Sequence, residues 1–500
     1  MNEQTPQTSG YSFPEPPKKE SFPTGKPELF FGIVCLFLAL GLGNSILYGG
    51  FNLGFALFAG TGLLVAVAYL VLKNCKLTFY SGALLVLTLV LIAGFARSND
   101  GFVKFVCFLF LMLSGNLGLC ILAGKNHWTP AGIRSLLDAP MTFFGLGFGK
   151  LSESTRGLGQ ALRNTGTAGK KGGAVLLGLC VAVPILLLLI SLLSSADAAF
   201  EGIVKLLPEW DIKELIATLI FGGGLFFILY TRAAALAHAP VASSQTKTHK
   251  GINSLTVNTV LVAVAFVYLV YLFSQLAYFS GGFSGILPEG YTNAEYARRG
   301  FFEMAWLCSI NLVIIVLAAG FTAREKKLPA ATKILCLFIG LVTLFLTITA
   351  SAKMILYISA YGLTRLRLLT EVIMAFVGVT TAIVTLWLFL PRLPYMQVVL
   401  VLALVIGASV LWADVDTMVA HYNVRAYQSG QLDSIDITYL NTLGDGSVPY
   451  LIELTKDPDP DIASYATKCL MSRKGNGPAD FRDWNYAKEA TSSALEDFFG

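Results

Sequence analysis

Long apolar runs recur along this sequence and leave few residues for a surface that faces water. A helix needs about 20 apolar residues to cross the roughly 30 Å hydrocarbon core of a bilayer. Charged residues make up only 13% of the chain, against about 25% in soluble domains. The sequence therefore predicts an all-α, polytopic membrane bundle of about eleven transmembrane helices. The expected spans are 29–47, 52–72, 77–96, 102–123, 173–194, 212–231, 255–279, 302–321, 331–352, 368–390 and 394–413.

The distribution of basic residues predicts how the chain threads the membrane. With the N-terminus in the cytoplasm, 20 Lys and Arg side chains fall on the inner side and nine on the outer side. Loops that stay in the cytoplasm carry such an excess. We therefore expect a cytoplasmic N-terminus and, with an odd number of spans, an extracytoplasmic C-terminus. Residues 1–28 are polar with six prolines, which predicts a disordered tail ahead of a transmembrane domain, 29–413.

The end of the chain has the opposite charge to the rest. Residues 414–500 have a net charge of −7, whereas residues 1–413 have +12. The basic excess follows the positive-inside pattern, so we expect no nucleic-acid partner. Segments 447–454 and 462–471 have helical patterns and flank the sequence DPDPD, as in one hairpin of a HEAT-type repeat. We predict an acidic helical C-terminal domain, 414–500, which is either a packed cap or a surface for a protein partner.

The longest predicted inner loop, 124–171, is basic and rich in glycine. Within it, residues 141–148 (MTFFGLGF) are apolar and are followed closely by Lys150. Apolar segments flanked by cations suit a position in the headgroup plane, where anionic lipids attract them. A solvated loop that obeys the positive-inside pattern explains the same residues. Both interpretations stay open, and contact of 124–171 with anionic lipid is a prediction.

Charged residues gather at the outer edge of two predicted spans. In both spans a Glu follows an Arg by four positions, which places the two side chains on one helix face. Such pairs can anchor helices at the interface, or they can form a polar cluster for an anion, a proton or a lipid headgroup. The candidate ligand-binding residues are Arg298, Arg299, Glu303, Lys353, Arg365, Arg367 and Glu371.

Catalytic and metal-binding motifs are absent from the sequence. It has no HExxH, no GxSxG and no Rossmann fingerprint. The eight cysteines form no CxxC pair, and the four histidines are scattered without ligand spacing. We therefore predict no catalytic residue, no cofactor and no metal, and we do not expect an enzyme.

Two motifs resemble those of a known family. They are YARRGFFE at 296–303 and YISAYGLTRLR at 357–367, and segments 267–279 and 413–425 fit the same pattern. The chain is similar over about 170–450 to an uncharacterised bacterial multi-span family, a domain of unknown function of the 4173 or 4153 type. The resemblance implies a multi-pass protein of the bacterial plasma (inner) membrane and brings no established activity.

Two functions fit these observations. The first is a transporter- or channel-like protein that uses the outer Arg/Glu cluster. The alternative is a membrane signalling or assembly scaffold that acts through its C-terminal helical domain. A lipid-modifying enzyme is the weakest candidate, because its catalytic residues are missing. The sequence does not separate the first two functions, and the lipid bilayer is the one partner that both require.

Overall fold

The computed structural model describes residues 25–130, 132–164, 212–238, 251–282, 301–322, 328–475 and 477–500, together with Phe22 and isolated positions between 185 and 196. In this part of the chain nearly every element is a helix. The only extended pairing among the described residues is an isolated bridge between Ile252 and Thr322. The prediction of an all-α polytopic bundle is confirmed.

Nine described helices are long and apolar enough to cross a membrane. Ten of the eleven predicted spans coincide with helices, and the predicted span 173–194 lies outside the described residues except for isolated positions. The tenth helix, α3 (Phe79–Gly94), has only 16 residues. The nine are α1 (Lys26–Asn44, extended by a π-helical turn, Ser45–Gly49), α2 (Leu53–Leu72), α4 (Gly101–Leu122), α9 (Ile212–His238), α10 (Ser254–Gly282), α12 (Phe301–Phe321), α13 (Ala330–Tyr361), α14 (Arg365–Phe389) and α15 (Tyr395–Ala413).

Polar side chains fix where several of these helices begin. Thr78, Asp100 and Thr364 precede α3, α4 and α14, and each accepts a hydrogen bond from the backbone N–H three residues later, at 3.2, 2.9 and 3.3 Å. These are N-caps, which satisfy backbone donors that the first helical turn leaves unpaired. Gly362 has a φ of +76°, which lets the chain reverse between α13 and α14.

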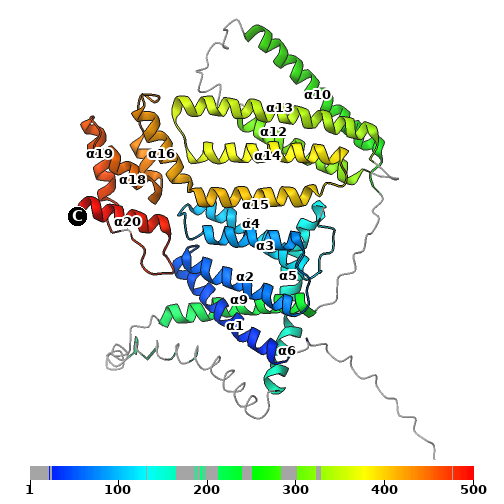
Figure 1. Cartoon of the computed structure of the whole chain (residues 1–500), viewed down its shortest axis with the longest axis vertical. Helices are drawn as coiled ribbons and strands as arrows, with labels where there is room; N and C mark the ends of the chain where they lie inside the picture. The colour runs from blue at the N-terminus through cyan, green and yellow to red at the C-terminus, as the bar shows by residue number, and fades with distance from the viewer. Residues whose placement is uncertain are drawn as a thin grey trace, which may run out of the picture.

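The helices pack side by side in a bundle, as Figure 1 shows. At one side, α1 lies against α9, and at the other α12, α13 and α14 pack together, with α3, α4 and α15 between the two groups. The contact between α1 and α9 is close: a Cβ on Gly43 would lie 2.8 Å from the Cα of Gly222. Glycine at both positions therefore permits this approach.

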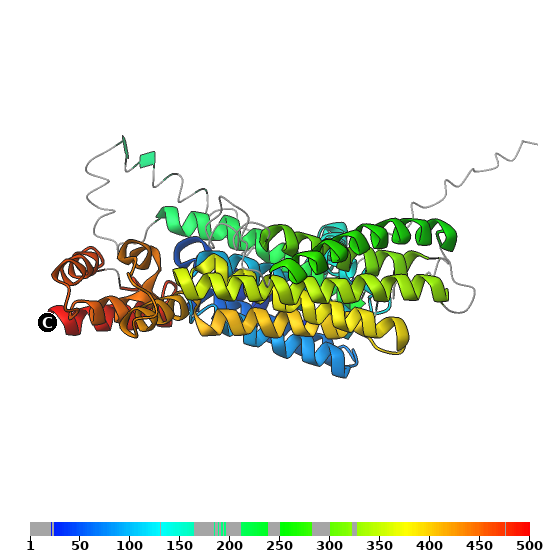
Figure 2. The same ribbon diagram turned by 90° about the horizontal axis from the view of Figure 1, so that it is seen from above.

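The two ends of the bundle are covered differently (Figures 1 and 2). At one end lie α5 (Asp138–Gly149) and α6 (Leu151–Asn164) from the predicted inner loop. The opposite end carries the C-terminal helices α16 (Val415–Gln428), α17 (Ile437–Thr442), α18 (Val448–Leu454), α19 (Pro460–Met471) and α20 (Tyr486–Phe499). The expected hairpin around DPDPD corresponds to α18 and α19, and Asp459 caps α19. The loops α1–α2, α3–α4 and α13–α14 reach the same end as the C-terminal helices.

Candidate functional site

Five of the seven residues of the predicted outer cluster lie in the described part of the chain. Arg298 and Arg299 lie outside the described residues. The other five members lie on α12 (Glu303), α13 (Lys353) and α14 (Arg365, Arg367 and Glu371), and these three helices pack against one another. Glu303 and Lys353 each interact with another group. The contacts of the three α14 residues are described in turn below.

Arg365 binds carboxylates that the chain itself supplies. Its guanidinium contacts both oxygens of Asp416 on α16, with Nη2 2.6 Å from Oδ2, and its Nε lies 3.6 Å from Asp100 Oδ2. Asp416 is 2% exposed and also accepts a hydrogen bond from the backbone N–H of Gly444 at 2.7 Å. Bidentate Arg–carboxylate contacts are among the strongest polar interactions in proteins. Arg365 thus connects α14, the α3–α4 loop and the first C-terminal helix.

Arg367 and Glu371 do not form the i,i+4 pair that their spacing allows. Arg367 donates to the backbone oxygens of Tyr361, at 3.1 Å, and Gly362, and its guanidinium lies 4.2 Å from the ring centroid of Tyr357. It therefore holds the α13–α14 turn. One carboxylate oxygen of Glu371, Oε1, is buried and has no hydrogen-bond partner among the described residues.

A second arginine joins the C-terminal region to the other side of the bundle. Arg482, in the segment before α20, contacts Glu214 at the start of α9 and donates to Asn44 Oδ1 at the end of α1 at 3.0 Å. Its Nη2 also lies 2.5 Å from Asp480 Oδ2. Hydrogen bonding of the Arg482 side chain to Asp480 lowers the pKa of the Asp480 carboxyl below its ordinary value. Arg365 and Arg482 therefore tie the C-terminal helices to helices from both groups of the bundle.

Asp414 lies where α15 meets α16 in an uncommon conformation. Its φ is +56°, a left-handed value that Asn and Asp tolerate better than most residues. The buried carboxylate accepts hydrogen bonds from the hydroxyls of Thr417, at 2.7 Å, and Ser98, at 3.3 Å. Burial raises the pKa of the Asp414 carboxyl above its ordinary value. We refer to the contacts of Arg365, Asp100, Asp414, Asp416 and Arg482 as the outer junction, after the side of the membrane on which the sequence predicts them.

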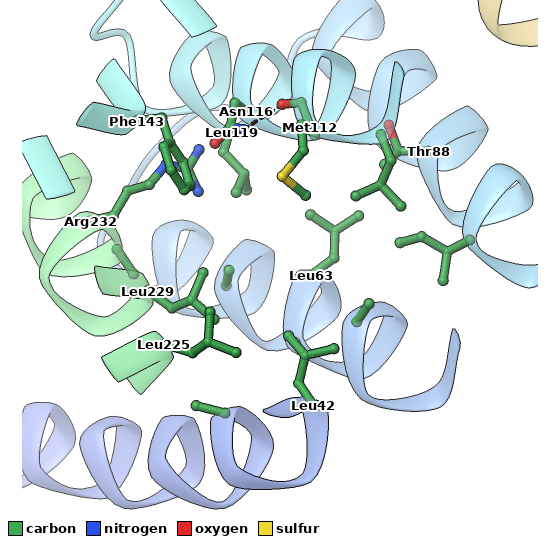
Figure 3. Close-up of a pocket in the computed structure, with 18 of the residues that line it drawn as sticks. Leu42, Leu63, Thr88, Met112, Asn116, Leu119, Phe143, Leu225, Leu229 and Arg232 are labelled. Atoms are coloured by element: carbon green, nitrogen blue, oxygen red, sulfur yellow. Dashed lines mark hydrogen bonds between the residues drawn. The ribbon is translucent and has the colours of Figure 1, made fainter. Parts of the chain in front are cut away.

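A cavity of about 700 Å³ lies among α1, α2, α3, α4, α5 and α9. Its volume falls within the range of about 300–1,000 Å³ that is common for ligand sites. Aliphatic and aromatic side chains form most of the wall, as Figure 3 shows. Besides the thiol of Cys35, the polar side chains in the wall are Thr88, Asn116 and Arg232. Thr88 and Asn116 donate hydrogen bonds to backbone oxygens of their own helices.

Arg232 is the unusual member of this cavity wall. It lies on α9, is 6% exposed, and its Nε and Nη2 have no hydrogen-bond partner in the described part of the chain. Its guanidinium lies 5.8 Å from the ring centroid of Phe143 on α5 (Figure 3). The carboxylate of Asp138, on the same helix as Phe143, accepts hydrogen bonds from the backbone N–H groups of His127 and Trp128. A buried charge without a counterion costs several kcal/mol, because the protein interior solvates it poorly.

The sequence prediction did not identify this site. Arg232 was counted only as one of the inner basic residues after the span 212–231, whereas α9 continues to His238 and buries it. An arginine inside a long apolar helix was the available signal, because ionisable residues within spans are rare. No group of three or more potential metal-ligating side chains occurs among the described residues.

Comparison with known proteins places the chain in a family. No curated protein and no solved structure matches it. One family model matches residues 82–454, a longer segment than the 170–450 of the sequence resemblance. The matched segment runs from α3 to α18 and so contains Arg232, Phe143 and Arg365. Because the match covers well over half of the sequence, this multi-pass membrane protein belongs to the family described as Domain of unknown function (DUF4153).

Proposed function

We propose that this protein is a transporter-like membrane protein that binds its ligand in the cavity around Arg232. One observation carries the proposal: a buried guanidinium in the wall of a cavity of ligand size has two nitrogens without a hydrogen-bond partner among the described residues. Structural arginines are usually paired when buried, because an isolated charge is costly in an apolar environment. A site that keeps this charge unpaired is suited to bind and release an external partner.

The arrangement of the helices supports this role. The cavity lies within the bundle and among five helices of membrane-spanning length or composition, so a ligand there is enclosed within the membrane region. We propose that the chain resides in the bacterial inner membrane with its N-terminus in the cytoplasm. Helices α5 and α6 then lie at the cytoplasmic side, where the basic residues of 124–171 would contact anionic lipids. The C-terminal helices then lie outside.

The outer cluster has a different role in this proposal. Arg365 and Arg367 bind groups of the chain itself, Asp416, Asp100 and the α13–α14 turn. We propose that these two cations position the outer end of the bundle. Glu303, Lys353 and Glu371, together with Arg298 and Arg299, are left as candidates for contact with an outer ligand.

The test is to fill the cavity without disturbing the fold. Gly62 on α2 lines the cavity, and a Cβ added there meets no atom within 4 Å. In the native host, we would compare the small molecules and lipids of cells and medium between wild type, a deletion strain and Gly62→Phe. We expect the Gly62→Phe strain to reproduce the changes seen in the deletion strain.

The matched control is Gly224→Phe on α9. A Cβ there also meets no atom within 4 Å, but Gly224 does not line the cavity. This strain should match wild type. The proposal is wrong if Gly62→Phe is produced at normal abundance and its strain has the same small molecules and lipids as wild type. The cavity then does not carry the function.

A second candidate function is a scaffold that acts through the C-terminal helices, and the outer junction favours it. Arg365 and Arg482 couple these helices to α14, α1 and α9, so a partner bound there would act on the whole bundle. Cross-linking with purification of the full-length protein tests this function. The scaffold predicts a partner that an Arg482→Gln variant loses while it stays folded and abundant, whereas an unchanged set of partners counts against it.

A further inference from the structure

This inference rests on the proposed role of the cavity and specifies its ligand. We propose that the cavity binds an anionic amphiphile with a single acyl chain, whose headgroup pairs with Arg232 and whose chain occupies the apolar part of the cavity. The headgroup is a carboxylate or a phosphate, since a guanidinium forms bidentate hydrogen bonds with both.

The charge of the site selects an anion. Arg232 is the one charged side chain among the described residues that line the cavity. Its Nε and Nη2 have no hydrogen-bond partner in the described part of the chain, and two neighbouring donors of a guanidinium match the spacing of two oxygens on a carboxylate or a phosphate. A neutral ligand would leave the charge uncompensated. A cation would be repelled.

The rest of the wall selects an apolar body. Leu42 and Leu63, on α1 and α2, lie away from the guanidinium, and Leu225 and Leu229 continue the apolar wall along α9 (Figure 3). A free inorganic anion would pair with Arg232 and leave this apolar volume unused. At about 30 Å³ for a group of the size of water, 700 Å³ accommodates roughly 23 such groups, which suits one acyl chain with its headgroup.

Helix α5 places the cavity next to the surrounding lipid. Phe144 lines the cavity and is nevertheless 60% exposed, and Pro140, also in the cavity wall, is exposed as well. Met141 and Phe148 continue the exposed apolar face of α5. Because Phe144 belongs both to the cavity wall and to this exposed apolar face, we infer that an amphiphile enters here from the membrane without passing through water. The source of the ligand is therefore the lipid phase.

The test uses photoactivatable diazirine oleate and the full-length protein in nanodiscs. Mass spectrometry of the cross-linked peptides separates labelling of residues that line the cavity from labelling of the outer surface by oleate dissolved in the disc. We expect labelling of α5 and α9 at about one site per protein, with competition by unlabelled oleate and by lysophosphatidate. Acetate, inorganic phosphate and the neutral amphiphile monoolein should compete at least tenfold less well.

Three variants test the two parts of the site. Arg232→Gln should weaken competition by oleate at least tenfold, because a desolvated charge pair is lost. Gly62→Phe should abolish labelling, and Gly224→Phe should retain it. Equal competition by monoolein, or no effect of Arg232→Gln on a folded protein, would overturn the anionic headgroup. Competition by acetate or phosphate as strong as by oleate would overturn the acyl chain. If Gly62→Phe is still labelled, the ligand does not lie in the cavity. This variant keeps the test decisive if Arg232→Gln does not fold.

Failure of this inference is distinguishable from failure of the proposed function. If Gly62→Phe reproduces the deletion in the host but oleate does not label the cavity, the ligand class is wrong and the role of the cavity stands. If oleate labels the cavity but cells with Gly62→Phe match wild type, the ligand class stands and the transport role is wrong.

Discussion

At the scale of residues, three arginines of this chain differ in whether the described residues supply a partner for the guanidinium. Arg365 and Arg482 contact carboxylates of distant segments, whereas Arg232 has two nitrogens without a partner in the described part of the chain. In sequence all three are single basic residues close to the end of an apolar helix or outside one. The carboxylates of Asp416 and Glu214, which pair with Arg365 and Arg482, lie 51 and 268 positions away in the sequence. An arginine within a long apolar helix is a signal in the sequence, but only the folded chain shows which of the three arginines has a partner.

The loss of Arg365 should destabilise the outer junction. Arg365→Ala leaves the carboxylate of Asp416, 2% exposed, without its guanidinium partner. A buried charged acceptor that loses its partner costs about 1–3 kcal/mol, and the partial exposure of Arg365 places the effect at the lower end. Thermal unfolding of the purified protein measures this effect. Arg392→Ala, at an exposed loop position, is the control, and equal melting temperatures for the two variants would contradict the account.

Asp414 should make stability depend on pH. Burial raises the pKa of its carboxyl above the ordinary 3.8, so the folded state holds the proton at pH values where the unfolded chain has lost it. Stability therefore falls as pH rises from the unfolded to the folded pKa. Nearby Asp100 and Asp416 disfavour the charge further. Asp414→Asn removes this dependence, and Asn also tolerates the left-handed conformation.

We expect the advantage of Asp414→Asn over wild type to grow as pH rises from about 4 toward neutrality and then to level off. Melting temperatures of both proteins across this range give the difference directly. An advantage that shrinks as the pH rises would mean that the carboxylate is stabilised by its surroundings at the junction.

At the scale of elements, the apolar runs predicted where helices lie but not which faces meet. Spans such as 255–279 and 368–390 correspond to α10 and α14, because length and apolarity alone determine a spanning helix. Segment 141–148 was expected at the headgroup plane or in solvent, and in the structure α5 packs against α4 and α9 and forms a wall of the cavity. The cavity could not be predicted, because it arises from faces of six helices that lie far apart in the sequence.

The close contact of α1 and α9 can be tested with two glycines of α9. A Cβ on Gly222 would lie 2.8 Å from the Cα of Leu40, whereas a Cβ on Gly224 meets no atom within 4 Å. Gly222→Ala should therefore destabilise the protein by about 1–3 kcal/mol through overpacking. Gly224→Ala should be neutral or stabilising by up to about 1 kcal/mol, because Ala is the better helix former. Thermal unfolding compares the pair, and an equally stable Gly222→Ala would show that the two helices are not in close contact.

At the scale of the whole molecule, the bundle has two dissimilar ends. The C-terminal helices and the outer junction occupy one end, and α5 and α6 occupy the other. The family match, residues 82–454, includes α4, α5 and α9 of the cavity wall but not α1 and α2. The positive-inside pattern predicts which end faces the cytoplasm, and this orientation is part of the proposed function.

Cysteine labelling tests that orientation. The natural Cys469 is only 5% exposed, so we would use Met471→Cys, at a position 60% exposed, in a background with Cys75→Ser. A membrane-impermeant maleimide should label it in cells whose inner membrane is intact. Lys76→Cys, at an exposed position in the α2–α3 loop at the opposite end, should react only after permeabilisation. The reverse result would place the C-terminal helices in the cytoplasm and favour the scaffold.

The central claim is that the cavity around Arg232 holds a ligand from the membrane. The most direct measurement is a cryo-electron microscopy map of the full-length protein extracted with its native lipids. The account predicts an elongated density in the cavity, with its head within hydrogen-bond distance of the Arg232 guanidinium and its tail among the leucines of α1, α2 and α9. The map of Gly62→Phe should lack this density. A wild-type cavity that is empty, or filled by a segment of the chain that pairs with Arg232, would contradict the claim.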